Sequence, residues 1–173
     1  MEAECLAFSQ IPHQNRLFVD FLENFSRVAG FYPTAPSDKG AITARAGALQ
    51  YPAERRAAVA EVLERQSRSF EAPAEVLKNI QRFRAGALAV VSGQQVTLFG
   101  GPAYSFYKAL SAIWLAKELT ERGTPAVPVF WLATQDHDFA EVSEATLRSP
   151  AGLRTFSIHS GGTDGAPVGG GAR

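Results

Sequence analysis

Two clusters of polar residues each follow a short apolar run and could carry chemistry. The first, Ser92-Gly93-Gln94-Gln95, comes directly after the apolar residues 87–91, and Gly100-Gly101 closes the same loop. The second, Asp136-His137-Asp138, lies just beyond the apolar residues 127–132. In parallel α/β sheets, small molecules bind in the crevice outside the carboxyl ends of the strands. The two clusters therefore predict one shared ligand site.

The glycine-containing loop indicates an anion site. Glycine lets backbone N–H groups approach a ligand closely, and a helix N-terminus attracts phosphate or carboxylate. Gln94 and Gln95 add amides that both donate and accept, while Tyr104 and Lys108 lie one helical turn apart on a face directed toward the loop. The loop matches neither a P-loop nor G-x-G-x-x-G. The alternative is a turn that only permits tight packing, with Lys108 as a surface lysine.

The acid-flanked histidine indicates proton transfer. Two carboxylates beside the His137 imidazole could orient it for general acid or base catalysis near neutral pH, and could also hold Mg²⁺. Adjacent residues of an extended segment point in opposite directions, so a polar loop in which Asp136 or Asp138 caps a helix is the alternative. The isolated His13 and His159 have no metal-ligand partners nearby in the sequence. We predict no dedicated metal site.

Bulk composition excludes several classes of protein. The chain has 173 residues, with 17 Lys and Arg against 17 Asp and Glu, which argues against nucleic acid or an anionic membrane as partner. Cys5 is the only cysteine, so no internal disulfide forms and a reducing compartment is favoured. No apolar run approaches the ~20 residues that span a bilayer, and the first residues lack an export signal. We expect a cytoplasmic protein.

The elements that position the two clusters follow from hydrophobic spacing. Apolar residues three and four apart predict helices at residues 14–29, 52–70, 73–86 and 102–122. Two short uncharged runs, 87–91 and 127–132, predict strands buried on both faces, and residues 153–158 favour a third strand. Strand, helix and strand make a βαβ unit. The fold class is therefore α/β, with a Rossmann-like parallel sheet core preceded by N-terminal helices.

The expected organisation has three parts. Residues 1–85 form a helical segment that packs on the core, 86–160 form the Rossmann-like core, and the Gly-rich residues 161–173 form a tail with little to pack. Several side chains are assigned inward positions or one common helix face. Val59, Val62 and Leu63 are expected to point inward, Trp114 and Trp131 to lie in the core, and Phe106, Leu110, Ile113 and Ala116 to share a face.

These strings resemble the bacillithiol biosynthesis cysteine-adding family (BshC). The resemblance rests on S-G-Q-Q, L-F-G-G-P, Tyr104, Lys108 and P-V-F-W-L-A-T-Q-D-H-D-F-A-E-V, and it covers essentially the whole chain. Residues 18–22 and Phe31-Tyr32-Pro33 are also similar to that family's N-terminal segment. One departure is Gln135, where the family's pattern is E-D-H-D, so a role for this position as metal ligand or base is in doubt.

The resemblance implies a longer protein, with a coiled-coil-bearing arm and a homodimeric form, of which this chain is the N-terminal piece, truncated within the core and inactive alone. It implies ligation of cysteine to the amino group of glucosaminyl-malate, the last step of bacillithiol synthesis, for which ATP would activate the cysteine carboxylate. Mg²⁺ is the second cofactor expected, from the two aspartates beside His137. The Gly93 to Gly101 loop and Lys108 would hold phosphates, and His137 with its flanking aspartates would orient substrate or take a proton. The alternatives are a nucleotide- or sugar-binding Rossmann-like module and a nucleotidyltransferase-like enzyme.

Overall fold

Two parallel strands joined through one long helix form the centre of the fold. The computed structural model describes residues 5–135 and 139–159. Its helices are α1 (Arg16–Glu23), α2 (Lys39–Ala48), α3 (Ala53–Ser69), α4 (Ala74–Arg84), α5 (Ala103–Glu121) and α6 (Phe139–Val142), with 3-10 turns η1 (Phe8–Gln10), η2 (Phe25–Arg27) and η3 (Leu98–Gly100). Its strands are β1 (Leu88–Gln94), β2 (Ala126–Leu132), β3 (Glu144–Ser149) and β4 (Gly152–Ser157).

The chain divides into two units, Met1–Tyr51 and Pro52–Arg173. In the first unit, the helix expected at residues 14–29 ends at Glu23 and continues only as the turn η2. Asn24 leaves the helical region with φ −135° and ψ 50°, which breaks the ladder of hydrogen bonds. The helix α2 was not predicted, because it is rich in Ala and Gly and lacks a strong apolar stripe; the Asp38 carboxylate caps it by accepting from the Ala41 N–H.

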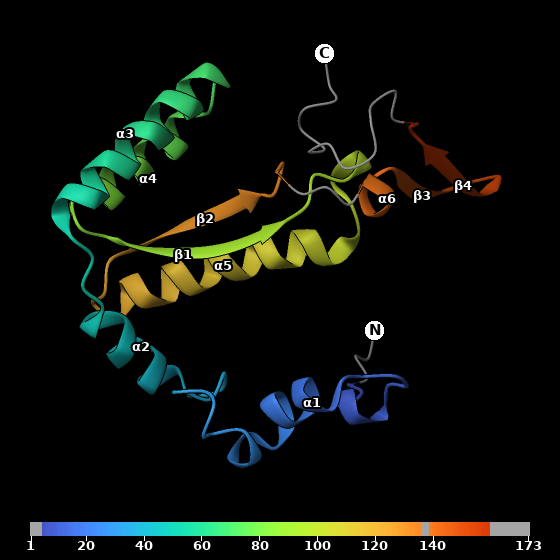
Figure 1. Ribbon diagram of the computed structural model, residues 1–173, viewed down its shortest axis with the longest axis horizontal. Helices are drawn as coiled ribbons and strands as arrows, with labels where there is room; N and C mark the ends of the chain where they lie inside the picture. Colours follow the sequence, from blue (N-terminus) through green and yellow to red (C-terminus); the bar gives the residue numbers. More distant parts are fainter. Residues whose placement is uncertain (1–4, 136–138, 160–173) are drawn as a thin grey trace. The chain divides into compact units, whose positions relative to one another are not determined.

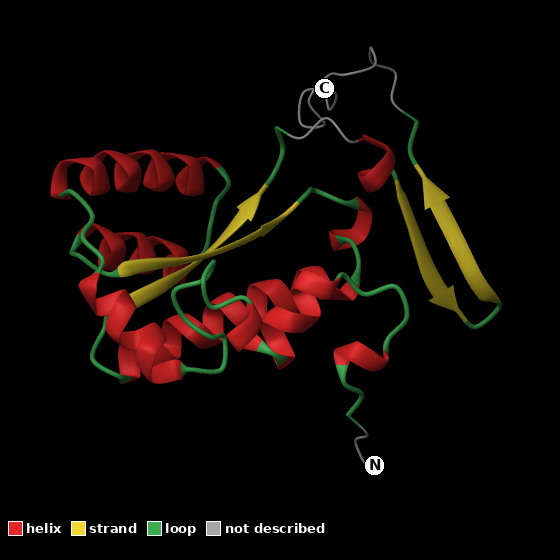
Figure 2. Cartoon of the chain, turned by 60° about the horizontal axis from the view of Figure 1, so that its bottom comes forward, coloured by secondary structure: helices red, strands yellow, loops and turns green. Residues whose placement is uncertain are grey.

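In the second unit, helices cover both faces of the parallel sheet. Strands β1 and β2 pair in register from Leu88 with Ala126 to Gln94 with Leu132. Helix α5 runs along one face, and the α3–α4 hairpin lies over the other face near the strand starts (Figures 1 and 2). The boundary expected between residues 85 and 86 falls inside this unit, since α3 and α4 belong to it. The predicted βαβ arrangement is confirmed.

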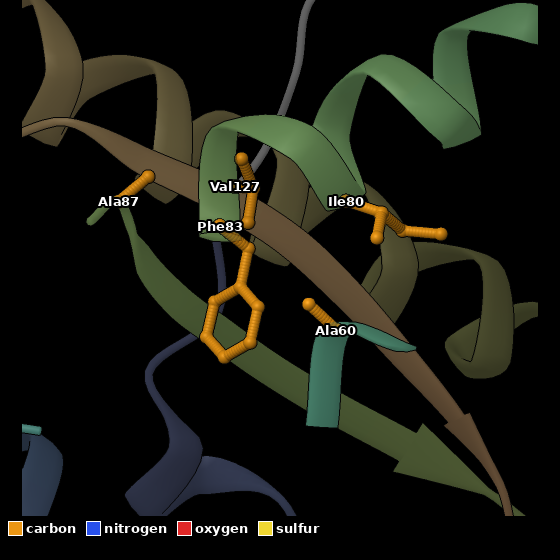
Figure 3. Packing of buried hydrophobic residues seen from close by; sticks show 5 residues of the cluster. All are labelled: Ala60, Ile80, Phe83, Ala87 and Val127. Carbon is orange, nitrogen blue, oxygen red and sulfur yellow. The ribbon is translucent and has the colours of Figure 1, made fainter. Parts of the chain in front are cut away.

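A small apolar core joins the α3–α4 hairpin to the sheet. It contains Ala60, Ile80, Phe83, Ala87 and Val127, with Leu63 and Leu77 packed against it (Figure 3). The buried Arg56 guanidinium donates to the carbonyl oxygens of Phe83 at 3.2 Å and Ala87 at 2.7 Å. Those carbonyls lie at the end of α4 and just before β1, so Arg56 ties the helix end to the start of the strand, and the Phe83 carbonyl also accepts from the Gly86 N–H at 3.1 Å.

Several inward assignments were wrong. Val59 and Val62 are exposed, because Arg56, Ala60 and Leu63 take the positions facing α4 and the sheet. Trp114 is 73% exposed and Trp131 is 55% exposed, so neither belongs to the core. On α5, the predicted face of Phe106, Leu110, Ile113 and Ala116 buries only Ala116. Small residues, Ser105, Ala112 and Ala116, face the strands together with Leu119, since they allow a close approach of helix and sheet.

The strands also differ from the prediction. β1 continues beyond residue 91 through Gln94, so Ser92, Gly93 and Gln94 belong to the strand. Neither strand is buried on both faces along its whole length: Val91 is 63% exposed, because α4 packs mainly against β2 in the described residues. β4 at Gly152–Ser157 confirms a strand near residues 153–158, but it pairs antiparallel with β3 in a separate hairpin.

Within residues 5–135 and 139–159, no helix is both long and apolar enough to span a lipid bilayer.

Candidate functional site

The two strand ends that carry the polar clusters lie side by side. Gln94 at the end of β1 is in register with Leu132 at the end of β2. The next residue after β2, Ala133, donates its N–H to the Gln94 carbonyl at 3.0 Å, and the Thr134 N–H turns back to the Leu132 carbonyl at 2.9 Å. The segments that follow β1 and β2 therefore leave the sheet at one edge, where parallel α/β sheets bind ligands.

Gln94 is the centre of the hydrogen bonding at this edge. It is only 8% exposed, and its Oε1 accepts from Lys108 Nζ at 2.7 Å. Its Nε2 donates to the Tyr104 hydroxyl oxygen at 3.2 Å and to Gln95 Oε1 at 2.7 Å. Lys108 Nζ also donates to the Gly93 carbonyl at 3.3 Å and lies 5.1 Å from the centre of the Tyr104 ring. Tyr104 and Lys108 thus share the face of α5 directed toward the strand end, as their spacing predicts.

The loop from β1 to α5 is a tight turn that needs its glycines. Gly100 and Gly101 have φ values of +83° and +77°, which favour glycine, and Phe99 has φ +54°, a rare value for a bulky residue. A Cβ on Gly101 would lie 3.1 Å from Thr97 Cβ and 3.4 Å from Ser105 Oγ. The N–H groups of Gly100 and Gly101 donate to the Thr97 and Leu98 carbonyls at 3.1 and 3.0 Å. These two N–H groups are used within the turn, and the predicted binding role of Gly100 and Gly101 stays a prediction.

The backbone N–H groups in the first turn of α5 are an alternative to the glycine N–H groups for binding an anion. The N-cap of this helix is Pro102, which provides no side-chain cap, so the first N–H groups of the helix lack that partner. Ser105 in the same turn is 6% exposed, and its Oγ has no hydrogen-bond partner among the described residues. Sequence reasoning missed Ser105. The available signal was a hydroxyl residue three positions after the proline that begins a helix.

An open groove of about 410 Å³ runs between β1 and α5. Ser92, Tyr104 and Lys108 give it a polar end, while Val90, Val91 and Leu115 make it apolar farther along. The predicted residues Ser92, Tyr104 and Lys108 therefore share one surface with access for a small molecule. The groove's remaining lining residues are Tyr107, Ser111 and Ala112.

The other predicted residues divide into two groups. Asp136, His137 and Asp138 lie outside the described residues, and Gln135, just before them, is exposed. His13, His159 and Cys5 are all exposed, away from the strand ends in sequence. Across residues 5–135 and 139–159, no group of three His, Cys, Asp or Glu side chains is arranged to hold a metal ion.

Comparisons with known proteins agree with this architecture. Residues 1–170 match the family described as "Bacillithiol biosynthesis BshC, N-terminal Rossmann-like domain". Proteins named "Putative cysteine ligase BshC" are similar to the chain: that of Koribacter versatilis is 41% identical over 97% of the chain, and that of Solibacter usitatus is 46% identical over 83%. The aligned part covers 32% and 26% of those two relatives. The chain thus spans about a third or less of the length of the curated relatives it matches.

Proposed function

Because the chain belongs to the BshC family, we propose that it provides the N-terminal Rossmann-like part of a ligase that joins cysteine to the amino group of glucosaminyl-malate, the last step of bacillithiol synthesis. The observation that carries the proposal is the match over residues 1–170, which includes both strand ends. The relatives' name supports the ligase assignment. The substrates and the use of ATP belong to the proposal alone.

Forming an amide from a carboxylate and an amine requires one carboxylate oxygen to leave. ATP, when bound, supplies a phosphoryl or adenylyl group that carries this oxygen away. The residues present fit such a polyanion, since the first turn of α5 has no side-chain cap and Lys108 contributes a positive charge beside it. Lys108 and the first turn of α5 would hold negative charge, and Ser92 in the groove would bind a polar group of the substrate. Mg²⁺ would require carboxylates, for which Asp136 and Asp138 are the candidates in the sequence.

The incoming amine must lose a proton as the new C–N bond forms. His137 is proposed to take that proton, with Asp136 and Asp138 orienting the imidazole. Support comes from sequence position, since His137 follows Thr134 by three residues, and Thr134 lies at the same sheet edge as Gln94. The chain has already left the sheet at Thr134, where the backbone turns.

A nucleotide- or sugar-binding module without ligase chemistry is the second candidate. The Gly100 and Gly101 N–H groups donate within the turn, so the loop does not offer them to a phosphate as the loops of phosphate-transferring enzymes do. This observation favours binding without phosphate chemistry. A nucleotidyltransferase-like enzyme would require the same anion site. Its reaction products would distinguish it from a ligase.

Deleting the gene and measuring the cell's thiols by mass spectrometry tests the proposal. The expected result is loss of bacillithiol with accumulation of glucosaminyl-malate, restored by the wild-type gene. Restoration with His137→Ala should fail, whereas restoration with His159→Ala, an exposed histidine away from the proposed site in sequence, should succeed. An unchanged thiol pool after deletion would refute the ligase function, and full activity of His137→Ala would remove that residue from the mechanism.

A further inference from the structure

We propose that Gln94 is a positioning residue that turns the Tyr104 hydroxyl into a hydrogen-bond donor, so that Tyr104 and Lys108 together bind an oxyanion of the substrate. The inference rests on the proposed function for the identity of that substrate. It rests on the hydrogen bonds at the end of β1 for everything else.

Lys108 determines which way the Gln94 amide faces. An ammonium group has three donors and no acceptor, so the group 2.7 Å from Lys108 Nζ must be the amide oxygen. The reverse orientation would place an N–H donor against an ammonium donor and leave both unpaired. The charge of Lys108 therefore fixes the amide, which removes the usual ambiguity between its oxygen and nitrogen.

The fixed amide in turn determines the role of Tyr104. Gln94 Nε2 has two N–H groups, and they are directed to Gln95 Oε1 at 2.7 Å and the Tyr104 oxygen at 3.2 Å. The Tyr104 oxygen therefore accepts from Gln94, and its single proton cannot point back to that nitrogen. No acceptor for this proton is present among the described residues, and the side chain, at 47% exposed, borders the groove.

Lys108 completes the pair of donors. Two of its N–H groups are directed to Gln94 Oε1 and the Gly93 carbonyl, which leaves a third for a ligand. One positive charge and two donors, from neighbouring turns of α5, suit a carboxylate or phosphate oxygen. Gln94 itself is nearly buried, so it acts through Tyr104 rather than by touching the ligand. Both sources of such an oxyanion occur in the proposed reaction: the malate part of glucosaminyl-malate and the phosphates of ATP.

Gln94→Glu is the informative variant. A glutamate has nearly the same shape, but its carboxylate only accepts, so it would still bind Lys108 while drawing the Tyr104 proton away from the groove. Binding of ATP and of glucosaminyl-malate to the full-length protein would be measured separately by calorimetry. We expect Tyr104→Phe and Gln94→Glu each to weaken the binding of one of the two ligands roughly 10- to 100-fold, the range for a hydrogen bond to a charged group. The affected ligand identifies the source of the oxyanion.

The double variant separates this inference from simple charge repulsion. If the carboxylate introduced by Gln94→Glu acts by capturing the Tyr104 proton, adding Tyr104→Phe to the Gln94→Glu protein should cause no further loss of ligand affinity. If the carboxylate acts only by repelling the anion, Tyr104→Phe should reduce ligand affinity in the Gln94→Glu protein by the same factor as in the wild-type protein. That result would overturn the inference. Gln94→Met offers no N–H to the Tyr104 oxygen, so the hydroxyl proton is no longer directed to the groove and Tyr104→Phe should cause a smaller loss of affinity in that background. This variant provides the test should Gln94→Glu fold poorly, and an undiminished effect of Tyr104→Phe there would overturn the inference.

The same measurements distinguish this inference from the proposed function. A protein that shows the non-additive binding pattern but forms no bacillithiol from cysteine, ATP and glucosaminyl-malate would refute the ligase and leave the role of Gln94 standing. If the wild-type protein forms bacillithiol but the affinity losses of Gln94→Glu and Tyr104→Phe multiply in the double variant, only the role of Gln94 is refuted. If neither ligand binds the wild-type protein, both proposals fail.

Discussion

Removing the Ser105 hydroxyl should make the protein more stable. Ser105 faces the sheet from the first turn of α5, and its Oγ is buried without a hydrogen-bond partner in the described part of the chain. Such a group loses its water on folding and gains nothing in return. Ser105→Ala removes the hydroxyl and keeps the Cβ. Ser111→Ala is the matched control, because Ser111 lies on the same helix and is exposed.

The size of the effect follows from two contributions. Burial of an unpaired hydroxyl costs about 1–3 kcal/mol in proteins, and Ser105→Ala recovers this free energy less a small loss of packing around one oxygen atom. Alanine is also the better helix former by roughly 0.5 kcal/mol, a gain that both variants share. Subtracting the Ser111→Ala result leaves the burial contribution, which we expect to increase the free energy of unfolding by about 1–2 kcal/mol.

Urea unfolding of the three proteins, followed by circular dichroism, measures this difference directly. In heating experiments each kcal/mol should raise Tm by roughly 2–4 °C for a domain of this size. An equal m-value in all three proteins would show that the unfolded state is unchanged. The reasoning is refuted if Ser105→Ala is less stable than Ser111→Ala, because the hydroxyl would then have a partner beyond residues 5–135 and 139–159.

Three further outcomes are expected. Gly101→Ala should destabilise by about 1 kcal/mol or more, since its φ is +77° and the new Cβ would crowd two neighbouring side chains, whereas Gly30→Ala, with nothing within 4 Å, should change the unfolding free energy little. Arg56→Met should lower the urea midpoint by an amount equivalent to about 1–3 kcal/mol, because the Ala87 and Phe83 carbonyls lose a charged donor, although the Phe83 carbonyl keeps a backbone donor, the Gly86 N–H. The hydrogen bond from Arg68 lowers the pKa of Glu64 below its ordinary value of 4.5, so the stability that the Glu64 carboxylate contributes is present above pH 4.5 and lost as pH falls below it. The stability difference between wild type and Glu64→Gln, measured by urea titration over a series of pH values, should therefore be present at neutral pH and decrease as the pH falls below 4.5 through the lowered pKa of Glu64.

The βαβ unit could be predicted because its signals are local. A short uncharged run is too brief for a helix, and Pro102 and Gly123 mark the two ends of α5 to within about one or two residues of the observed bounds. The end of β1 was harder to place, because Ser92 and Gly93 are polar or flexible residues that are typical of loops. Pairing with Phe130 and Trp131 of β2 keeps them in the strand, and that contact is separated from them by a whole helix.

Burial on α5 could not be predicted for a related reason. Its apolar residues occur on nearly all sides, so hydrophobicity does not mark the face that meets the sheet. Ala112 and Ala116 pack against the strands, since small side chains allow the helix to lie close to the sheet. The larger Phe106 and Trp114 are exposed. The pairing of β4 with β3 was likewise hidden, because strand propensity does not identify the partner strand.

The extra length of β1 changes the chemistry of the site as well as the length of a strand. Side chains alternate along a strand, so Gln94 points to the same face as Ser92 and Val90, the face that α5 covers. In a loop, its amide would be free to rotate and to bind solvent. In the strand, it is held against Lys108 and Tyr104, which lie one turn apart on the helix above it. The direction of a single amide, and with it the donor role proposed for Tyr104, therefore depends on three residues of strand that continue past the apolar run.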